Sequence, residues 1–279
     1  MQVINYQGLH RISTWKSRTL RFDPVRWLSI ICAVLGWQLL SMYNAAHHLF
    51  NPVFLPSPVM VLNAARDLYR TGELFQHVSQ SAIRLLLGFS LGTVGAVFAG
   101  IFIGRSRFLE SVISPLIDLI GPIPPFALLP IFIIWFGVGE MPKLLFIAYA
   151  TFLPIMAQTV EGIKSVNPLL VRSAFSLGAN EAQVFRRVIL KSALPQIFLA
   201  MRLSLALSFS ALVVAEMIGA DAGLGYLIID SRNFFRMANM FLAASLIGVE
   251  YTLFSLILSK LEKRLFRWRK TGLTAALER

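Results

Sequence analysis

Long apolar runs are the feature of this sequence that most constrains its fold. A helix of roughly 20 apolar residues crosses the hydrocarbon core of a bilayer. Runs of this kind occur at 27–43, 82–104, 112–136, 143–163, 196–219 and 239–258. They are continuous and do not alternate with period two, which disfavours a transmembrane β-barrel. Only 14% of the residues are charged, against about a quarter in soluble domains. The sequence therefore predicts an all-α polytopic membrane protein with six transmembrane helices.

The distribution of Lys and Arg predicts which side of the membrane each loop faces. The net charge of +12 is concentrated at the ends of apolar runs, and cytoplasmic flanks carry such an excess. The basic residues assigned to the outer side are Arg66, Arg70, Lys143, Arg232 and Arg236. Both termini are therefore predicted to be cytoplasmic, with a basic N-terminus (1–26), a transmembrane domain (27–258) and a basic tail (259–279). The same distribution argues against nucleic acid as a partner.

Two of the runs carry further structural signals. The third run contains five prolines, which predict two helical pieces joined by an unwound GPIPP. They are Pro115, Pro122, Pro124, Pro125 and Pro130. Asp118 lies near this break, and it is either a functional group within the membrane or part of a kink at the cytoplasmic interface.

In the second run, Gly88, Gly92, Gly95 and Ala99 recur at spacings that predict a close helix-packing face. Outside the runs, 59–69 is expected to form a short amphipathic helix in an outer loop.

Residues 164–195, between the fourth and fifth runs, are too polar to cross the membrane. Gly178 interrupts a helical pattern, and Asn180 with Gln183 three residues later has the pattern of a capping box. We expect a helix–turn–helix on the cytoplasmic side that is continuous with the adjacent spans. Such an element could pass the movement of a soluble partner into the membrane, or it could simply pack on its own spans.

This segment resembles a motif of one transporter family. The spacing from Ala174 to Gly178, and then to the apolar run at 188–190, is similar to the EAA loop of ABC importer permeases, E-A-A-x3-G-x9-I-x-L-P. Arg172 replaces the Glu of that motif, Ser173 its first Ala, and Lys191 its Pro. The segments LPSP, GELFQHVSQSAIRLLLGFSLG, IPPFALLPIFIIWFGVGE and VVAEMIGADAGLGYLI resemble the taurine, aliphatic sulfonate, nitrate and bicarbonate branch.

The resemblance implies a type I ABC importer permease fold and several partners. Two permease chains, expected to be identical, would form the pathway in the bacterial inner membrane. Two ATPase subunits, which hold ATP and Mg, would dock on the loops, and an extracytoplasmic binding protein would deliver a small anion, taurine or an alkanesulfonate foremost. Nitrate or bicarbonate is the alternative substrate. The implied ATPase-coupling residues are Arg172, Ser173, Ala174, Leu177, Gly178, Ala179, Asn180, Glu181 and Val184.

The translocation pathway is predicted to run past the break in the third run and along the fifth run. Its candidate residues are Asp118, Pro122, Pro124, Pro125, Trp135, Ser208, Ser210 and Glu216. A carboxylate opposes an anionic substrate, so the favoured interpretation of Glu216 is a structural partner near the outer interface.

Other classes of protein lack their expected signals in this sequence. No G-x4-G-K-[ST] phosphate loop is present, so the chain is not expected to hydrolyse ATP or hold a cofactor. An ion-coupled transporter would show a second broken span as the mate of the first. An intramembrane enzyme would need a motif such as H-E-x-x-H or G-x-S-x-G, and neither occurs. His47 and His48 are adjacent and point in different directions on a helix, so no metal site is predicted.

Overall fold

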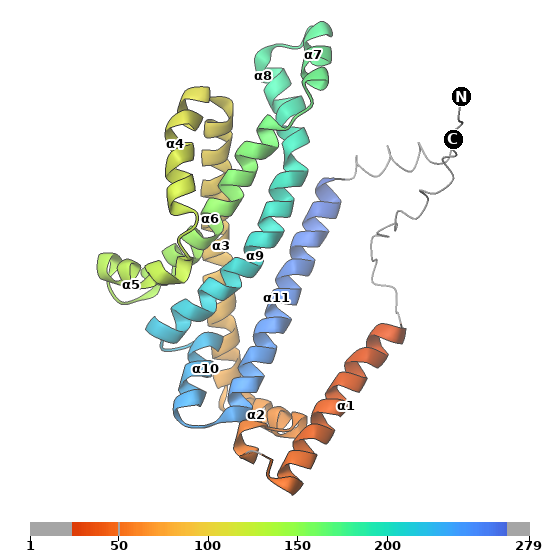
Figure 1. Ribbon diagram of the computed structural model, residues 1–279, viewed down its shortest axis with the longest axis vertical. Coiled ribbons are helices and arrows are strands. Elements are labelled where there is room, and N and C mark those ends of the chain that lie inside the picture. Colours follow the sequence, from red (N-terminus) through yellow and green to blue (C-terminus); the bar gives the residue numbers. More distant parts are fainter. Residues whose placement is uncertain (1–23, 50, 267–279) are drawn as a thin grey trace, which may run out of the picture. The chain divides into compact units, whose positions relative to one another are not determined.

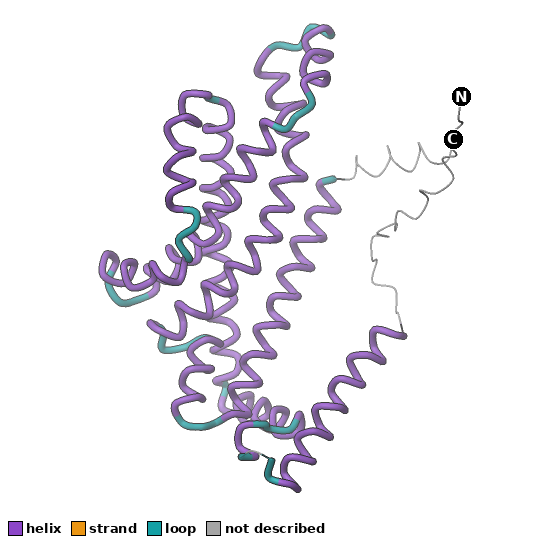
Figure 2. Tube along the Cα trace, viewed as in Figure 1, coloured by secondary structure: helices purple, strands orange, loops and turns teal. Residues whose placement is uncertain are grey.

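The computed structural model describes residues 24–49 and 51–266, and within these ranges the chain is helical without strands (Figure 2). The chain divides into two units, Met1–Pro52 and Val53–Arg279. The first unit contains α1 (Pro24–His47), which covers the first predicted span. Most of the predicted basic N-terminus and the end of the predicted basic tail lie outside the described residues.

Four long helices of the second unit run side by side (Figure 1). They are α3 (Glu73–Arg105), α6 (Glu140–Lys164), α9 (Leu190–Gly219) and α11 (Met237–Leu265). With α1, the described residues hold five helices that are long and apolar enough to cross a membrane, or six if one bent pair counts as a span. This confirms the predicted architecture. α3 begins well before the predicted residue 82, and its 33 residues extend for about 50 Å, so it is longer than a bilayer core of roughly 30 Å.

The bent pair is the predicted broken span. α4 (Arg107–Ile120) and α5 (Pro125–Phe136) meet at an angle of 101°. Pro125 occupies the first turn of α5, where its missing N–H costs no helical hydrogen bond. Pro115 and Pro130 instead remain inside their helices. The break therefore falls at residues 121–124, as the GPIPP pattern predicted.

Small residues allow α3 and α6 to approach closely, which confirms the predicted packing face. A methyl group added at Gly92 would lie 2.4 Å from the carbonyl oxygen of Ala148, and one at Gly88 would lie 2.7 Å from Ile147. The side chains of the two helices and of α9 then form a common apolar core. Its fully buried members include Leu85, Phe146, Ile147, Leu205 and Leu212.

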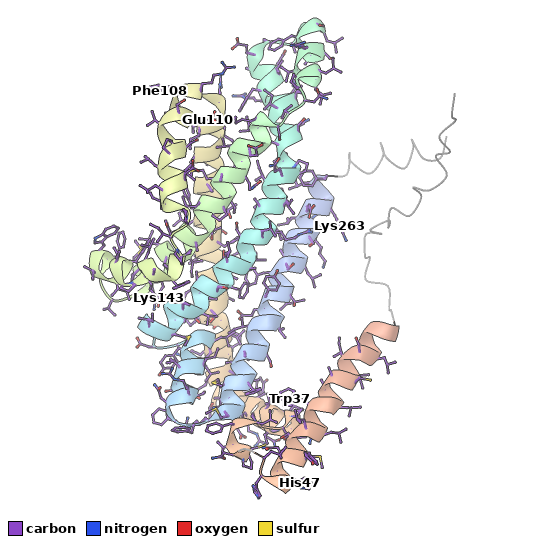
Figure 3. The ribbon with its side chains drawn as sticks, in the orientation of Figure 1. Trp37, His47, Phe108, Glu110, Lys143 and Lys263 are labelled. Carbon is purple, nitrogen blue, oxygen red and sulfur yellow. The ribbon has the colours of Figure 1, made fainter. Side chains whose placement is uncertain are left out.

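The short helices lie at opposite ends of this bundle (Figure 1). One end carries α7 (Pro168–Ser176) and α8 (Glu181–Val184), and Figure 3 places Glu110 and Lys263 toward the same end. The other end carries α2 (Pro58–Thr71) and α10 (Leu224–Asn233). α2 is the predicted amphipathic helix, with Val61, Ala64 and Leu68 on its buried face. Because the predicted cytoplasmic and outer loops separate in this way, the arrangement agrees with the charge distribution.

Candidate functional sites: the α7–α8 element and a buried ion-pair network

The predicted helix–turn–helix is present, and local side chains define its turn. α7 ends at Ser176, and Gly178 adopts a left-handed φ of 84°, which favours glycine. The Asn180 Oδ1 then accepts a hydrogen bond from the Gln183 N–H (2.9 Å), and the Gln183 Oε1 accepts one from the Asn180 N–H (3.0 Å). This confirms the capping box that begins α8. We call residues 168–184 the α7–α8 element.

The α7–α8 element is continuous with the fifth span. α8 passes through η2 (Phe185–Ile189), a π-helical turn, directly into α9, so that one apolar helix extends over Glu181–Gly219. The Arg105 guanidinium at the end of α3 lies 5.3 Å from the centre of the Phe185 ring. Phe185 also packs with Ile163 and Ile197 of α6 and α9. A displacement of the α7–α8 element would therefore reach three spanning helices.

The exposed surface of the α7–α8 element includes large apolar side chains beside polar ones. Leu177 is 88% exposed and Leu169 is 66% exposed, with Phe175 also exposed. Exposed apolar clusters on a solvent-facing tip commonly mark interaction sites. Among the predicted coupling residues, Val184 is buried and Ala174 and Ala179 are half-buried. The exposed ones are Arg172, Ser173, Leu177, Gly178, Asn180 and Glu181. Their contact with an ATPase remains a prediction.

The predicted pathway residues occupy two different environments. Those exposed on the surface of the chain are Asp118, Pro122, Pro124, Trp135 and Ser210, while Pro125 is half-buried. Ser208 instead faces the core, where its hydroxyl lies 2.9 Å from that of Thr151 on α6. Glu216 is also fully buried. Within residues 24–49 and 51–266, no hydrogen bond or ion pair joins any two of these eight side chains, so their role in a pathway remains a prediction.

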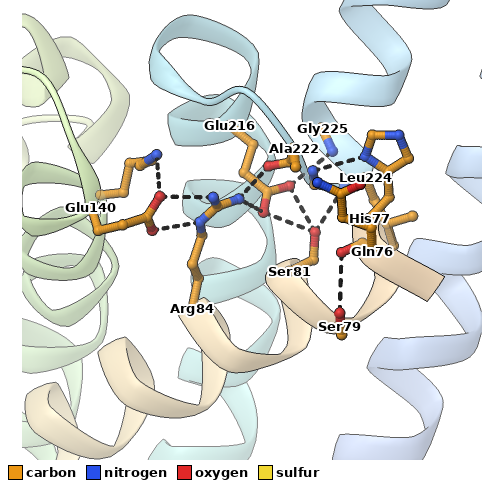
Figure 4. A network of polar contacts seen from close by, with 12 residues as sticks. Gln76, His77, Ser79, Ser81, Arg84, Glu140, Glu216, Ala222, Leu224 and Gly225 are labelled. Atoms are coloured by element: carbon orange, nitrogen blue, oxygen red, sulfur yellow. Dashed lines mark hydrogen bonds and ion pairs between the residues drawn. The ribbon is translucent and has the colours of Figure 1, made fainter. Parts of the chain in front are cut away.

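Glu216 belongs to a buried polar network near the outer end of the bundle, shown in Figure 4. Its carboxylate accepts hydrogen bonds from Arg84 Nη1 (2.9 Å), Ser81 Oγ (2.8 and 2.9 Å) and the Gly225 N–H (2.9 Å). Arg84 Nη1 also donates to the Ala222 carbonyl. The network thus ties α3 to α9 and to the start of α10, which agrees with the favoured interpretation of Glu216 as a structural partner.

A second carboxylate neutralises the other edge of Arg84. Arg84 Nε and Nη2 donate to the two carboxylate oxygens of Glu140 at 2.7 and 2.8 Å, a bidentate pairing. Lys143 Nζ also donates to Glu140, at 2.7 Å. The two cations and two carboxylates balance in charge, which reduces the cost of burying Arg84 and Lys143.

The same network orders the loop that precedes α10. His77 Nδ1 accepts a hydrogen bond from the Gly223 N–H, and Ser81 Oγ accepts one from the Leu224 N–H. The roles of His77, Ser81 and Arg84 were not predicted from the sequence. The available signal was Arg84 itself, because an ionised residue inside an apolar run needs a partner.

Comparisons with known proteins agree on one family. The chain is 36% identical over 229 residues to the taurine transport system permease protein TauC of Escherichia coli (strain K12), covering 80% of this chain and 83% of that protein. It is 36% identical over 243 residues to the putative aliphatic sulfonates transport permease protein SsuC of Bacillus subtilis (strain 168), covering 87% and 86%.

A solved structure, described as inward-facing conformations of the MetNI methionine ABC transporter, has a similar fold. It superimposes with a TM-score of 0.61 at 16% identity and covers 70% of this chain and 97% of that one. At this low identity the likeness concerns the fold alone, which is that of a type I ABC importer permease. The family described as binding-protein-dependent transport system inner membrane component matches residues 92–270, and this chain belongs to it.

Proposed function

We propose that this chain is the permease subunit of an ATP-driven importer for taurine or another alkanesulfonate in the bacterial inner membrane. Two identical copies form the pathway, and an extracytoplasmic binding protein delivers the substrate. Two ATPase subunits, which bind ATP and Mg, dock on the α7–α8 elements. The chain itself contributes the translocation pathway and the α7–α8 element that couples it to the ATPase, rather than a catalytic group.

The α7–α8 element is the observation that carries this proposal. Its Leu169, Phe175 and Leu177 are exposed at the end of the bundle that the Lys and Arg distribution assigns to the cytoplasm, while its far end continues into α9 without a break. Apolar side chains favour binding to a groove on a partner protein. The rigid connection then converts closure of the ATPase pair into movement of α9, and through Phe185 and Arg105 into movement of α3.

The substrate class follows from the relatives. TauC and SsuC are named for taurine and aliphatic sulfonates, and the alignments with both extend over most of this chain. Taurine and the alkanesulfonates share a small sulfonate group with one negative charge. Nitrate, the alternative anion, shares the charge but lacks the alkyl group.

Docking and transport can be tested on the same preparation. The permease is co-expressed with its ATPase and binding protein and reconstituted in vesicles, and uptake of labelled taurine is measured with ethanesulfonate or nitrate as competitor. Competition by ethanesulfonate but not nitrate is expected. Deletion of residues 172–188 should abolish both ATPase co-purification and uptake. Uptake that persists after this deletion would refute the proposal.

A further inference from the structure

We propose that Arg84, within α3, and Lys143, in the first turn of α6, form a recognition site for the sulfonate group. In the present structure the Glu140 carboxylate occupies this site, and the substrate displaces it. The inference rests on the proposed function, because it assigns the anion of that substrate to specific residues.

Two buried cations from different helices, Arg84 and Lys143, converge on the Glu140 carboxylate. Figure 4 shows the Arg84–Glu140 pair. The side chains of Arg84 and Lys143 are only 5% and 6% exposed. Arg84 directs Nε and Nη2, and Lys143 directs Nζ, toward the same carboxylate. Three donors and two positive charges therefore surround one anionic position.

The two carboxylates of the network differ sharply in their access to water. The side chain of Glu216 is 0% exposed, whereas that of Glu140 is 54% exposed. Glu216 is also held by Ser81 and the Gly225 N–H, so it cannot leave without stranding a buried charge. Glu140 can rotate into water, where a carboxylate is well solvated. The position of the Glu140 carboxylate is consequently the one that another anion can occupy.

The geometry favours replacement of the Glu140 carboxylate by another anion over a departure of Glu140 that leaves the site empty. Among the described residues, Glu140 is the acceptor that the structure provides for the Lys143 ammonium. If Glu140 left the site empty, a buried cation would lose its partner, which is strongly unfavourable. A sulfonate restores the missing charge and offers three oxygen acceptors to the guanidinium edge and the ammonium. Glu140 thus acts as a tethered competitor of the substrate.

The test measures anion binding to the permease–ATPase complex in lipid nanodiscs without the binding protein. Ethanesulfonate is titrated by calorimetry at constant ionic strength, with nitrate as a second probe. Glu140→Gln removes the competing charge but keeps the side-chain shape, so it should tighten ethanesulfonate binding at least tenfold. Adding Lys143→Gln to this variant should abolish the gain. Glu140→Asp keeps the charge on a shorter side chain, so its ethanesulfonate affinity should lie between those of the wild type and Glu140→Gln. This variant replaces Glu140→Gln in the test if Glu140→Gln does not fold.

Glu262→Gln is the matched control, because it removes one carboxylate from the half-exposed Arg202–Glu262 pair between α9 and α11. Its ethanesulfonate affinity should equal that of the wild type. Unchanged affinity in both Glu140 variants, a gain that survives Lys143→Gln, or a gain for nitrate alone would overturn the inference. These outcomes are distinct from failure of the proposed function, which would appear as absent taurine uptake by the wild-type complex.

Discussion

The contact between α3 and α6 makes a quantitative prediction for Gly92→Ala. The new methyl group would lie 2.4 Å from the Ala148 carbonyl oxygen and 2.9 Å from the Thr151 Cβ. A carbon–oxygen contact needs about 3.3 Å, so the two helix backbones must separate by almost 1 Å. Overpacking of this kind costs about 1–3 kcal/mol. A backbone atom, unlike the end of a flexible side chain, cannot rotate away.

Gly95→Ala is the matched control for this prediction. Its methyl group would lie 3.5 Å from the Phe152 ring, an ordinary contact. Both substitutions gain the same helix propensity, roughly 1 kcal/mol, so this term cancels when the two variants are compared. Gly92→Ala should therefore be less stable than Gly95→Ala by about 1–3 kcal/mol, or about 5- to 150-fold in the unfolding equilibrium.

The measurement is equilibrium unfolding of the purified permease in mixed micelles, followed by far-ultraviolet circular dichroism. Equal stability of Gly92→Ala and Gly95→Ala would refute the reasoning, since it would mean that α3 and α6 are not in close backbone contact in the folded protein. A lower stability of Gly95→Ala would refute it as well.

Three further predictions test the two candidate sites. Gly178→Val should destabilise the left-handed turn by about 1–2 kcal/mol and reduce ATPase co-purification. Asn tolerates this backbone conformation, so Gly178→Asn should retain co-purification. An equal loss of co-purification in both variants would contradict the role of the turn. Asn180→Ala removes the capping box and should cost about 1 kcal/mol, seen as faster amide hydrogen exchange in α8 without a change near Glu216. Glu216→Leu removes one of the two carboxylates that pair with Arg84 and so leaves an excess positive charge in the buried network, which should cost about 3–5 kcal/mol. Arg84→Met in the same chain removes that excess charge and should recover much of the stability; a double variant that is no more stable than Glu216→Leu would exclude the ion pair as the cause.

Much of the fold could be predicted because its determinants are local in the sequence. An apolar run long enough to cross a bilayer must satisfy its own backbone as a helix, and the Lys and Arg beside it set its orientation. The prolines near residue 122 end a helix whatever that helix packs against. Asn180 and Gln183, three residues apart, begin a helix through hydrogen bonds to each other. These features, together with the α7–α8 element that they delimit, were therefore visible in the sequence.

The tertiary structure alone decided which charges meet. Arg84 and Glu216 are 132 residues apart, and Arg84 and Glu140 are 56 apart. Their pairing depends on α3, α6 and α9 being neighbours, which no local pattern specifies. The sequence determined that α3 has a face able to pack closely, but only the fold showed that Ala148 of α6 fills it. Burial then explains the network, because a charge removed from water must find its partner in whichever helix the packing places beside it.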